Sequence, residues 1–244
     1  MIDNPFHLRG KRVLITGASS GIGRAVATEC AAAGATLVVN GRDPARLQAT
    51  LDSLDGEGHL AISADLTVPE QLTALVEQTG LIDGVVHGAG VHGVMPARMV
   101  RKVFLDNVFT ANFQAPVLLT QQLLYKKNLR DGASILFMSS IAAHTGTVGV
   151  GPYAASKGAL LGMMQSMALE VAPRKMRVNA LAPGLVNTPL VNLDPDWLAG
   201  KAEMYPLGIG EPEDVAYAAV YFLADVSRKI TGTSFHLDGG IGWT

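Results

Sequence analysis

The sequence predicts an α/β protein built on one doubly wound parallel sheet of seven strands, with helices on both faces. Short runs rich in β-branched residues alternate with stretches of helical apolar periodicity, which is the pattern of successive βαβ units. The 244 residues are 48% hydrophobic, enough for one large core, and no linker, repeat or low-complexity segment divides the chain. We therefore expect residues 1–244 to form a single domain.

Each expected element follows from a local pattern. The strands are predicted at residues 12–16, 36–40, 59–63, 84–87, 134–138, 177–181 and 234–237. Two long helices are expected at about residues 112–129 and 153–171, the second because of its Ala/Leu/Met-rich run. The irregular stretch 189–206 contains Pro195, Gly200 and bulky apolar residues, and it is predicted to be a substrate lid.

Composition excludes several classes of function. A formal charge of −2 without a block of like charges argues against nucleic-acid binding. The single cysteine, Cys30, lies in an Ala-rich helical pattern and is expected to be a buried structural thiol. No signal peptide and no apolar run long enough to span a bilayer is recognised, so we expect a cytoplasmic protein without membrane contact. No metal site is expected.

A glycine-rich loop follows the first predicted strand and opens a helix, over residues 16–23 with the sequence Thr-Gly-Ala-Ser-Ser-Gly-Ile-Gly. Gly17, Gly21 and Gly23 let backbone N–H groups approach a pyrophosphate at the positive end of that helix. This context predicts a Rossmann-type nucleotide loop. The Gly-x-x-x-Gly-x-Gly spacing differs from the common G-x-G-x-x-G fingerprint.

A phenol and an ammonium four residues apart, Tyr153 and Lys157, fall on one face of the second long helix. A neighbouring lysine cation favours the phenolate, so it is expected to lower the pKa of the tyrosine towards the working range. The pair alone is common on amphipathic helices. Together with a nucleotide loop, it predicts a proton-transfer device.

These motifs together resemble the short-chain dehydrogenase/reductase family over nearly the whole chain. The matching positions are residues 16–23, Asp65 and Leu66, residues 87–90, Asn112, Ser140, Tyr153, Lys157, residues 183–188 and residues 237–240. The resemblance implies that Tyr153 is the general acid and base, and that Ser140 hydrogen-bonds the reacting oxygen. It further implies that Lys157 binds the nicotinamide ribose and that Asn112 holds a water in a proton relay.

The resemblance also implies a set of cofactor-binding residues. They are Gly17, Ser19, Ser20, Gly21, Ile22, Gly23, Asn40, Arg42, Asp65, Leu66, Gly88, Ala89, Gly90, Tyr153, Lys157, Pro183, Gly184, Val186 and Thr188. Gly41 stands where NAD-dependent members carry an acid, and Arg42 beside it suits a 2′-phosphate, so NADPH is predicted rather than NAD. The alternative is a polar turn in which Arg42 pairs with Asp43. Asp65 is expected to accept from the adenine amino group.

Three of the six histidines lie in or near the predicted site. The family usually has Asn-Asn-Ala-Gly where this chain has His87-Gly-Ala-Gly90, and His87 is predicted to brace neighbouring strands. His92 and His144 belong to loops near the predicted site. Each either contacts a polar substrate group or faces solvent, and the second alternative is favoured.

The predicted activity is that of an NADPH-dependent carbonyl reductase or secondary alcohol dehydrogenase, with a 3-oxoacyl thioester on a carrier protein as the favoured substrate. An acidic carrier needs a basic approach, for which Lys126, Lys127, Arg130, Arg174 and Lys175 are candidates. The alternatives are reduction of a keto-sugar or other small ketone and, in another class, a non-catalytic dinucleotide sensor. The resemblance implies a homotetramer or dimer formed through the two long helices, with Phe113, Met163 and Met167 as contact residues.

Overall fold

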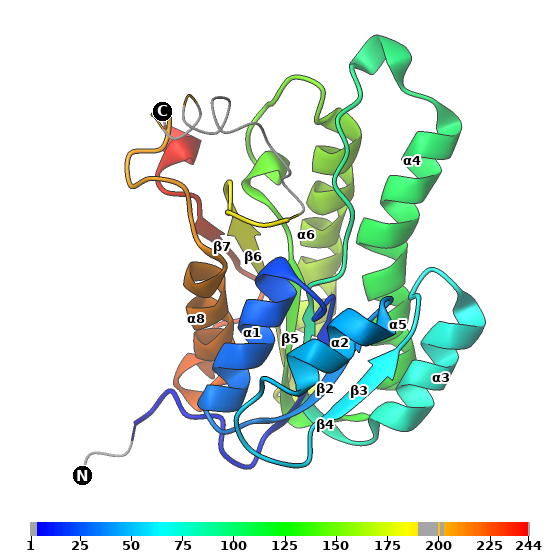
Figure 1. Cartoon of the computed structure of the whole chain (residues 1–244), viewed down its shortest axis with the longest axis vertical. Helices are drawn as coiled ribbons and strands as arrows, with labels where there is room; N and C mark the ends of the chain where they lie inside the picture. Colours follow the sequence, from blue (N-terminus) through cyan, green and yellow to red (C-terminus); the bar gives the residue numbers. More distant parts are fainter. Residues whose placement is uncertain (1–3, 190–199, 201–202, 244) are drawn as a thin grey trace.

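Seven parallel strands form one sheet in the order β3-β2-β1-β4-β5-β6-β7 in this computed structural model, which describes residues 4–189, 200 and 203–243 (Figure 1). The strands are β1 (Arg12–Thr16), β2 (Thr36–Gly41), β3 (Leu60–Ser63), β4 (Ile82–His87), β5 (Leu129–Met138), β6 (Arg177–Pro183) and β7 (Ser234–Leu237). The predicted fold class and all seven predicted strands are confirmed, although β5 begins earlier than residue 134. The strand order reverses between β1 and β4, which is where such sheets bind ligands at their carboxyl ends.

Helices cover both faces of the sheet (Figure 1). They are α1 (Gly21–Ala32), α2 (Pro44–Leu51), α3 (Pro69–Thr79), α4 (Lys102–Phe109), α5 (Ala115–Tyr125), α6 (Gly151–Val171) and α8 (Pro212–Leu223). Successive residues of β1 point to opposite faces of the sheet. Leu14 packs with the buried residues of α3, α5 and α6. Val13 and Ile15 pack with the buried residues of α1 and α8 on the other face. The period of two in a strand thus builds two apolar layers from one buried run.

The first long helix departs from its prediction. It begins at Lys102, ends at Tyr125, and contains a π-helical stretch at Thr110–Gln114 between α4 and α5. Pro116 accounts for the stretch, because it lacks the N–H that would bond to the carbonyl of Asn112 and its ring would clash with that carbonyl. The sequence interpretation of residues 112–129 as one regular helix is therefore wrong at both ends.

The second long helix, α6, matches its prediction closely. Most of the predicted lid at 189–206 lies outside the described residues, which leave out 190–199 and 201–202. No helix within the described ranges has both the length and the apolar character needed to cross a membrane.

Candidate active site

Three predicted site residues meet where β5 ends and α6 begins. Ser140 follows the end of β5, and its side chain lies beside that of Tyr153 in the first turn of α6, close enough to lower the pKa of the phenol. Lys157 lies one helical turn further along, with Nζ 5.8 Å from the centre of the Tyr153 ring. The predicted grouping of serine, tyrosine and lysine at the carboxyl edge is therefore present in the structure.

Neighbouring hydrogen bonds hold the loop after β5 in place. The Ser140 hydroxyl oxygen accepts from the backbone N–H of Ala142 at 3.1 Å and caps the following 3-10 turn. The Ser139 hydroxyl donates to the carbonyl of Lys157 at 3.1 Å, which joins the strand end to the tyrosine helix. Sequence reasoning missed Ser139, because a serine beside Ser140 gives no signal of this long-range contact.

Asn112 reaches the same place from the π-helical stretch. Its Oδ1 accepts from the N–H of Val91 at 2.8 Å, and its Nδ2 donates to the carbonyl of Val91 at 2.9 Å and to the Ser156 hydroxyl oxygen at 3.1 Å. Ser156 in turn donates to the carbonyl of Tyr153 at 2.7 Å. Ser156, within the Tyr-x-x-Ser-Lys motif, is a second residue that sequence reasoning missed. The water relay expected at Asn112 stays a prediction.

Electrostatics at the tyrosine are dominated by burial. Burial of the phenol raises the pKa of Tyr153, and the neighbouring Ser140 hydroxyl lowers it by less. Burial also lowers the pKa of Lys157 to about 8. The net shift of the Tyr153 pKa is therefore upward, because desolvation of the phenol dominates, and a lowering by Lys157 stays a prediction.

The two loop histidines behave differently. His92 is exposed to solvent, which is the favoured alternative, and its ring also lies against Tyr153, with the ring centres 4.9 Å apart and tilted by 59°. His144 instead contacts Ser234 of β7 through Nε2 at 3.2 Å and packs 4.3 Å from the ring of His236. The structure therefore adds His92 to the candidate site and leaves His144 outside it.

His87 is structural, as predicted, but it braces a helix as well as the sheet. Its ring stacks on Phe137 of β5 at 4.8 Å, and its Nε2 lies 2.8 Å from the hydroxyl oxygen of Thr120 in α5. Because Thr120 donates its only proton to the carbonyl of Pro116, we assign the Nε2–H tautomer to His87. Burial lowers the pKa of this imidazole to about 3.

The glycine-rich loop is packed too closely for side chains. Gly17 has φ of +70°, and a Cβ there would lie 2.7 Å from the backbone nitrogen of Ala89. A Cβ on Gly88 would lie 2.7 Å from the carbonyl oxygen of Thr16. The α1 helix begins at Gly21, directly after this loop, and Ser20 is its N-cap. The arrangement leaves free backbone N–H groups at the positive end of α1, which suits a pyrophosphate.

Distant parts of the chain complete the cradle. The Thr188 side chain lies within 3.3 Å of the position a Cβ would take on Gly21. A Cβ on Gly90 would lie 3.0 Å from Oδ1 of Asn112 and 3.5 Å from Nζ of Lys157. Predicted cofactor residues from the loops after β1, β4 and β6 therefore lie close together. These close approaches fit a dinucleotide lying across the carboxyl edge of the sheet.

The expected adenosine end is formed by the loops after β2 and β3. A Cβ on Gly41 would lie 3.0 Å from Oγ of Ser19, which explains why a small residue is needed here. Arg42 is exposed and forms no ion pair within the described part of the chain. The carboxylate of Asp43 instead accepts from the N–H of Arg46 at 3.1 Å and caps α2, so the alternative pairing with Arg42 is wrong.

Two further residues refine the adenosine end. Asn40 is buried, and its Nδ2 donates to the carbonyls of Ile62 and Ala64 at 3.0 and 3.2 Å, so this amide nitrogen joins β2 to β3. The role of Asn40 as a cofactor-binding residue stays a prediction, with its amide nitrogen already occupied. Asp65 accepts from Thr67 through Oδ1, which lowers its pKa and leaves Oδ2 for an adenine amino group.

The remaining predicted cofactor residues follow β6. Pro183 ends that strand, Gly184 packs on Asp238, and Val186 is buried and bridged to Gly210. A Cβ on Gly184 would lie 2.9 Å from Cα of Asp238. The path of this segment is thus set by backbone contacts with the C-terminal part of the chain.

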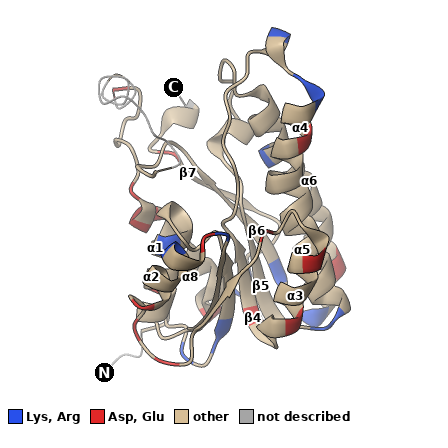
Figure 2. Ribbon diagram, turned by 45° about the vertical axis from the view of Figure 1, so that its right-hand side comes forward, with Lys and Arg blue, Asp and Glu red and all other residues tan. Residues whose placement is uncertain are grey.

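The basic residues expected to receive a carrier protein lie at the wrong end of the sheet. Lys126 and Lys127 precede β5 while Arg174 and Lys175 precede β6, so all four lie near the amino ends of the strands, opposite Tyr153. Three of the predicted residues are paired with acids: Lys126 with Glu77 at 2.8 Å, Arg130 with Asp83 at 3.5 Å and Arg174 with Asp131 at 2.8 Å. Figure 2 shows other blue segments at the tip above α4, on the carboxyl side.

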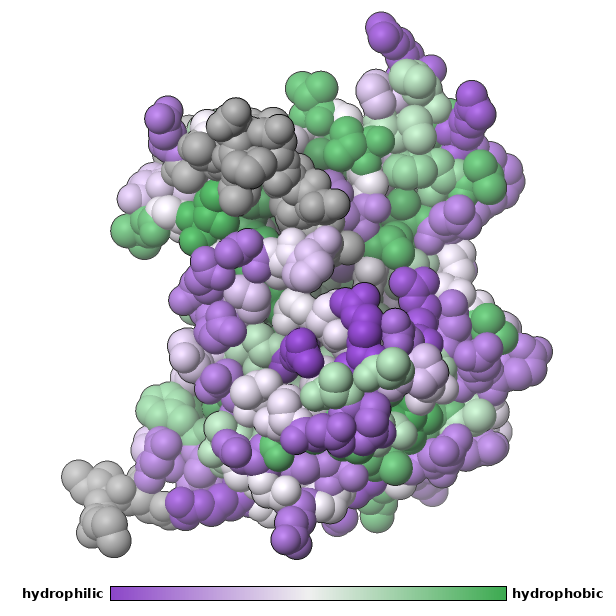
Figure 3. All heavy atoms as spheres, viewed as in Figure 1, coloured by the Kyte–Doolittle hydropathy of each residue, from purple (hydrophilic) through white to green (hydrophobic). Residues whose placement is uncertain are grey.

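The carboxyl side of the molecule is apolar around the candidate site. Figure 3 shows green side chains gathered in the upper half of this face, beside the grey segment. Val148 is 96% exposed and Val94 is 60% exposed, and their two loops are joined by a hydrogen bond from the N–H of Met95 to the carbonyl of Gly149 at 2.7 Å. Large exposed apolar residues on paired loops are typical of the rim of a ligand site.

The fold and the site define a dinucleotide-dependent oxidoreductase with a Ser-Tyr-Lys-Asn set. A family model described as enoyl-(acyl carrier protein) reductase matches residues 17–242. The 3-oxoacyl-[acyl-carrier-protein] reductase of Rickettsia prowazekii (strain Madrid E) is 32% identical over 236 residues, covering 96% of this chain and 98% of the relative. The chain belongs to the short-chain dehydrogenase/reductase family, and it is an oxidoreductase acting on carbonyl and alcohol groups with a nicotinamide dinucleotide.

Two further comparisons agree with this assignment. The (3R)-3-hydroxyacyl-CoA dehydrogenase of Homo sapiens is 34% identical over 253 residues, covering 96% of this chain and 96% of the relative. The solved structure of a dehydrogenase/reductase from Sinorhizobium meliloti 1021 matches with a TM-score of 0.92 at 30% identity, covering 97% of each chain.

Proposed function

We propose that the protein is an NADPH-dependent carbonyl reductase whose substrate is a 3-oxoacyl thioester. The observation that carries the proposal is the placement of Ser140 beside Tyr153, with Lys157 one turn away beside the nucleotide cradle. Two neighbouring hydroxyl groups suit a carbonyl oxygen that gains negative charge.

The side chains divide the work of reduction. When bound, the reduced nicotinamide supplies a hydride to the carbonyl carbon. Tyr153 donates its proton to the carbonyl oxygen, and Ser140 hydrogen-bonds the same oxygen as charge develops. The raised pKa of Tyr153 keeps the phenol protonated at neutral pH, which suits an acid acting in the reductive direction. Lys157 and Asn112 position the helix and the loop after β4, and Lys157 binds the ribose.

NADPH is proposed over NADH because of the surroundings of Arg42. Its guanidinium is exposed and forms no ion pair within the described residues, although it interacts electrostatically with Asp65, and Gly41 offers no acid to repel a 2′-phosphate. Arginine binds phosphate through two parallel N–H donors, which makes the contact strong and directional.

A 3-oxoacyl thioester is proposed because two relatives are described by such chemistry and because the site has an apolar rim. Val94 and Val148 offer exposed apolar surface to an acyl chain. The exposed side chains of Arg98 and Arg101 lie on the arm that follows β4, and they would face an acidic carrier. Free thioesters and carrier-bound thioesters are both included in the proposal.

Oxidation of NADPH and of NADH at neutral pH, followed with acetoacetyl thioesters and with keto-sugars, tests the function. We expect thioester-dependent oxidation of NADPH that disappears in Tyr153→Phe. Turnover of keto-sugars alone would favour reduction of a small polar ketone, an alternative supported by the imidazole of His92 beside Tyr153. Tight NADPH binding without turnover of any substrate would favour a dinucleotide sensor, although Ser140, Tyr153 and Lys157 are all retained.

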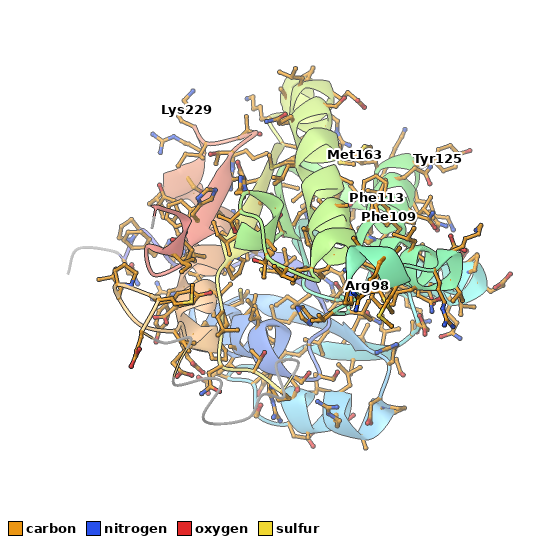
Figure 4. The ribbon with its side chains drawn as sticks, turned by 90° about the horizontal axis from the view of Figure 1, so that it is seen from above. Arg98, Phe109, Phe113, Tyr125, Met163 and Lys229 are labelled. Atoms are coloured by element: carbon orange, nitrogen blue, oxygen red, sulfur yellow. The ribbon has the colours of Figure 1, made fainter. Side chains whose placement is uncertain are left out.

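We also propose a homotetramer or dimer in the cytoplasm, assembled through the outer side of α4, α5 and α6. Figure 4 shows Phe109, Phe113 and Met163 grouped on this side, with Tyr125 near them. Tyr125 is 80% exposed and Leu169 is 79% exposed, which is unusual for large apolar residues on a monomer surface. Sedimentation of the protein and of Tyr125→Lys tests this: the variant is expected to dissociate.

A further inference from the structure

His92 is a polar residue beside the candidate catalytic tyrosine, and the mechanism proposed above gives it no role. It belongs to the segment after β4, directly after Val91, whose backbone N–H and carbonyl are both bound by Asn112. Its ring centre lies 4.9 Å from that of Tyr153 at a tilt of 59°. The position of this imidazole is therefore set by the same side chain that supports the site.

The hydrogen-bonding capacity of His92 is unused. Neither ring nitrogen has a hydrogen-bond partner within the described residues, and the side chain is exposed. Burial lowers the pKa of His92, so the ring is neutral at neutral pH and has one donor and one acceptor. The His92 ring is held by Tyr153 on one face, and its nitrogens form no hydrogen bond within the described residues. It is therefore suited to contact a ligand.

The loop that precedes α6 packs against the segment that carries His92. The N–H of Met95 donates to the carbonyl of Gly149 at 2.7 Å, and a Cβ on Gly149 would lie 2.8 Å from Cγ1 of Val94. The segment with His92 is thus packed against the loop that leads into α6 and Tyr153. A substrate bound with its carbonyl oxygen at the Tyr153 hydroxyl would lie near this segment, because the His92 ring is beside the Tyr153 ring.

We propose that His92 determines specificity by hydrogen-bonding a second substrate oxygen, carried within two carbons of the reacting carbonyl. The inference rests on the proposed carbonyl reduction and deepens it, because the thioester carbonyl of a 3-oxoacyl substrate is such an oxygen. When a bound substrate lacks this oxygen, it covers the imidazole and leaves it without a hydrogen-bond partner. Binding of such an analogue is therefore less favourable. Simple ketones are then poor substrates.

A matched pair of substrates isolates the contact. An acetoacetyl thioester of N-acetylcysteamine is compared with the 4-(alkylthio)butan-2-one in which the thioester carbonyl is replaced by CH₂. Both are measured with the wild type, His92→Phe, which keeps an aromatic ring on Tyr153, and His92→Gln, which keeps a donor and an acceptor. His144→Phe is the matched control, because His144 contacts Ser234 and His236 and not Tyr153.

We expect the preference for the thioester, taken as the ratio of kcat/KM values, to fall about tenfold in His92→Phe. Most of that preference should return in His92→Gln and remain in His144→Phe. NADPH affinity and thermal stability, measured alongside, should hardly change in any of the three. An equal loss for both substrates in His92→Phe, with no recovery in His92→Gln, overturns the proposal and leaves His92 a packing residue.

Failure of the thioester assignment gives a different result. If the wild type reduces only keto-sugars, the same comparison is made between a keto-sugar and its analogue lacking the hydroxyl next to the carbonyl. A ratio that still collapses in His92→Phe supports the role of His92 while refuting the thioester substrate. A ratio that does not change refutes both.

Discussion

Lys157 donates a hydrogen bond from Nζ to the backbone carbonyl of Met138 at 2.8 Å. The bond joins the tyrosine helix to the last residue of β5, two positions before Ser140. Lys157 is nearly fully buried, so this contact offsets part of the cost of desolvating its charge. The lysine therefore helps to hold the helix of Tyr153 against the strand end that leads to Ser140.

Replacing the tyrosine tests the proton donor. Tyr153→Phe removes only the hydroxyl, so kcat/KM should fall by about 10²- to 10⁴-fold, the usual contribution of general acid–base catalysis. Thermal unfolding and NADPH affinity should stay close to wild type, because the ring is retained. A variant that kept full activity would require another proton donor. Tyr125→Phe, on the outer side of α5 and 80% exposed, is the matched control.

The pH dependence of the reaction should report Lys157. Burial lowers its pKa to about 8, so the ammonium is present below that pH and is lost above it. The pKa of Tyr153 is raised from its ordinary value of 10.0, which removes the phenol as the cause of a change near pH 8. We expect kcat/KM for reduction to decline above pH 8. In Lys157→Arg the charge persists, and the decline should move to higher pH even if activity is lower throughout.

Arg42 should decide between the two nicotinamide dinucleotides. We expect Arg42→Ala to raise the Kd for NADPH roughly 10- to 100-fold, because a charged hydrogen-bond partner of the 2′-phosphate is lost. The Kd for NADH should hardly change. Arg98→Ala is the control, since Arg98 lies on the arm after β4, outside the cofactor cradle. Equal losses for both dinucleotides would point to a structural role for Arg42, and no loss would contradict the 2′-phosphate contact.

Most of the fold is predictable from local sequence patterns, because runs of β-branched residues and the spacing of glycines can be recognised within a few residues. The strands, α6 and the glycine-rich loop follow from such patterns, and Ser140, Tyr153 and Lys157 meet as expected. Contacts between segments that are distant in the sequence cannot be predicted from such patterns. That Asn40 uses its amide on β3, and that His92 reaches Tyr153, depend on how loops pack and not on local periodicity.

Two errors have specific physical causes. Pro116 widens the first long helix at Asn112, and a sequence pattern that sums propensities does not register the lost N–H. The expectation that the basic residues near α5 and β6 lie on the substrate side fails because helix ends can lie at either edge of the sheet. Their positions before β5 and β6 place them at the amino edge, where acids pair with three of them.

Asn112 should matter for both stability and activity. Asn112→Ala removes the side chain that binds both backbone groups of Val91 and the Ser156 hydroxyl, so we expect a loss of about 1–3 kcal/mol in unfolding free energy. Activity should fall as well, because the loop bearing His92 is released. Asn128→Ala is the control: its Nδ2 binds the carbonyl of Gly80 at 2.8 Å, at the opposite edge. This control should lose stability at constant kcat, measured below its unfolding temperature.

His87 should make the stability of the protein depend on pH in a recognisable way. Its imidazole is fully buried with a pKa of about 3, against an ordinary value of 6.5, because burial disfavours the charged ring. Below pH 6.5 the unfolded chain takes up a proton that the folded protein does not. Folding stability attributable to His87 is therefore complete above pH 6.5 and is lost as the pH falls towards 3, by about 1.4 kcal/mol per pH unit.

Urea unfolding of the wild type and of His87→Asn at pH 7 and pH 5 isolates this contribution. Asparagine does not titrate, so the wild type should lose roughly 2 kcal/mol more than the variant between the two pH values. At pH 7 the variant should itself be less stable, because it loses the stacking on Phe137 and leaves space beside Thr120. Parallel losses in the two proteins would mean that His87 is already protonated, or hydrated, in the folded state. The difference between the two slopes, and not the stability at either pH, is the measurement that decides.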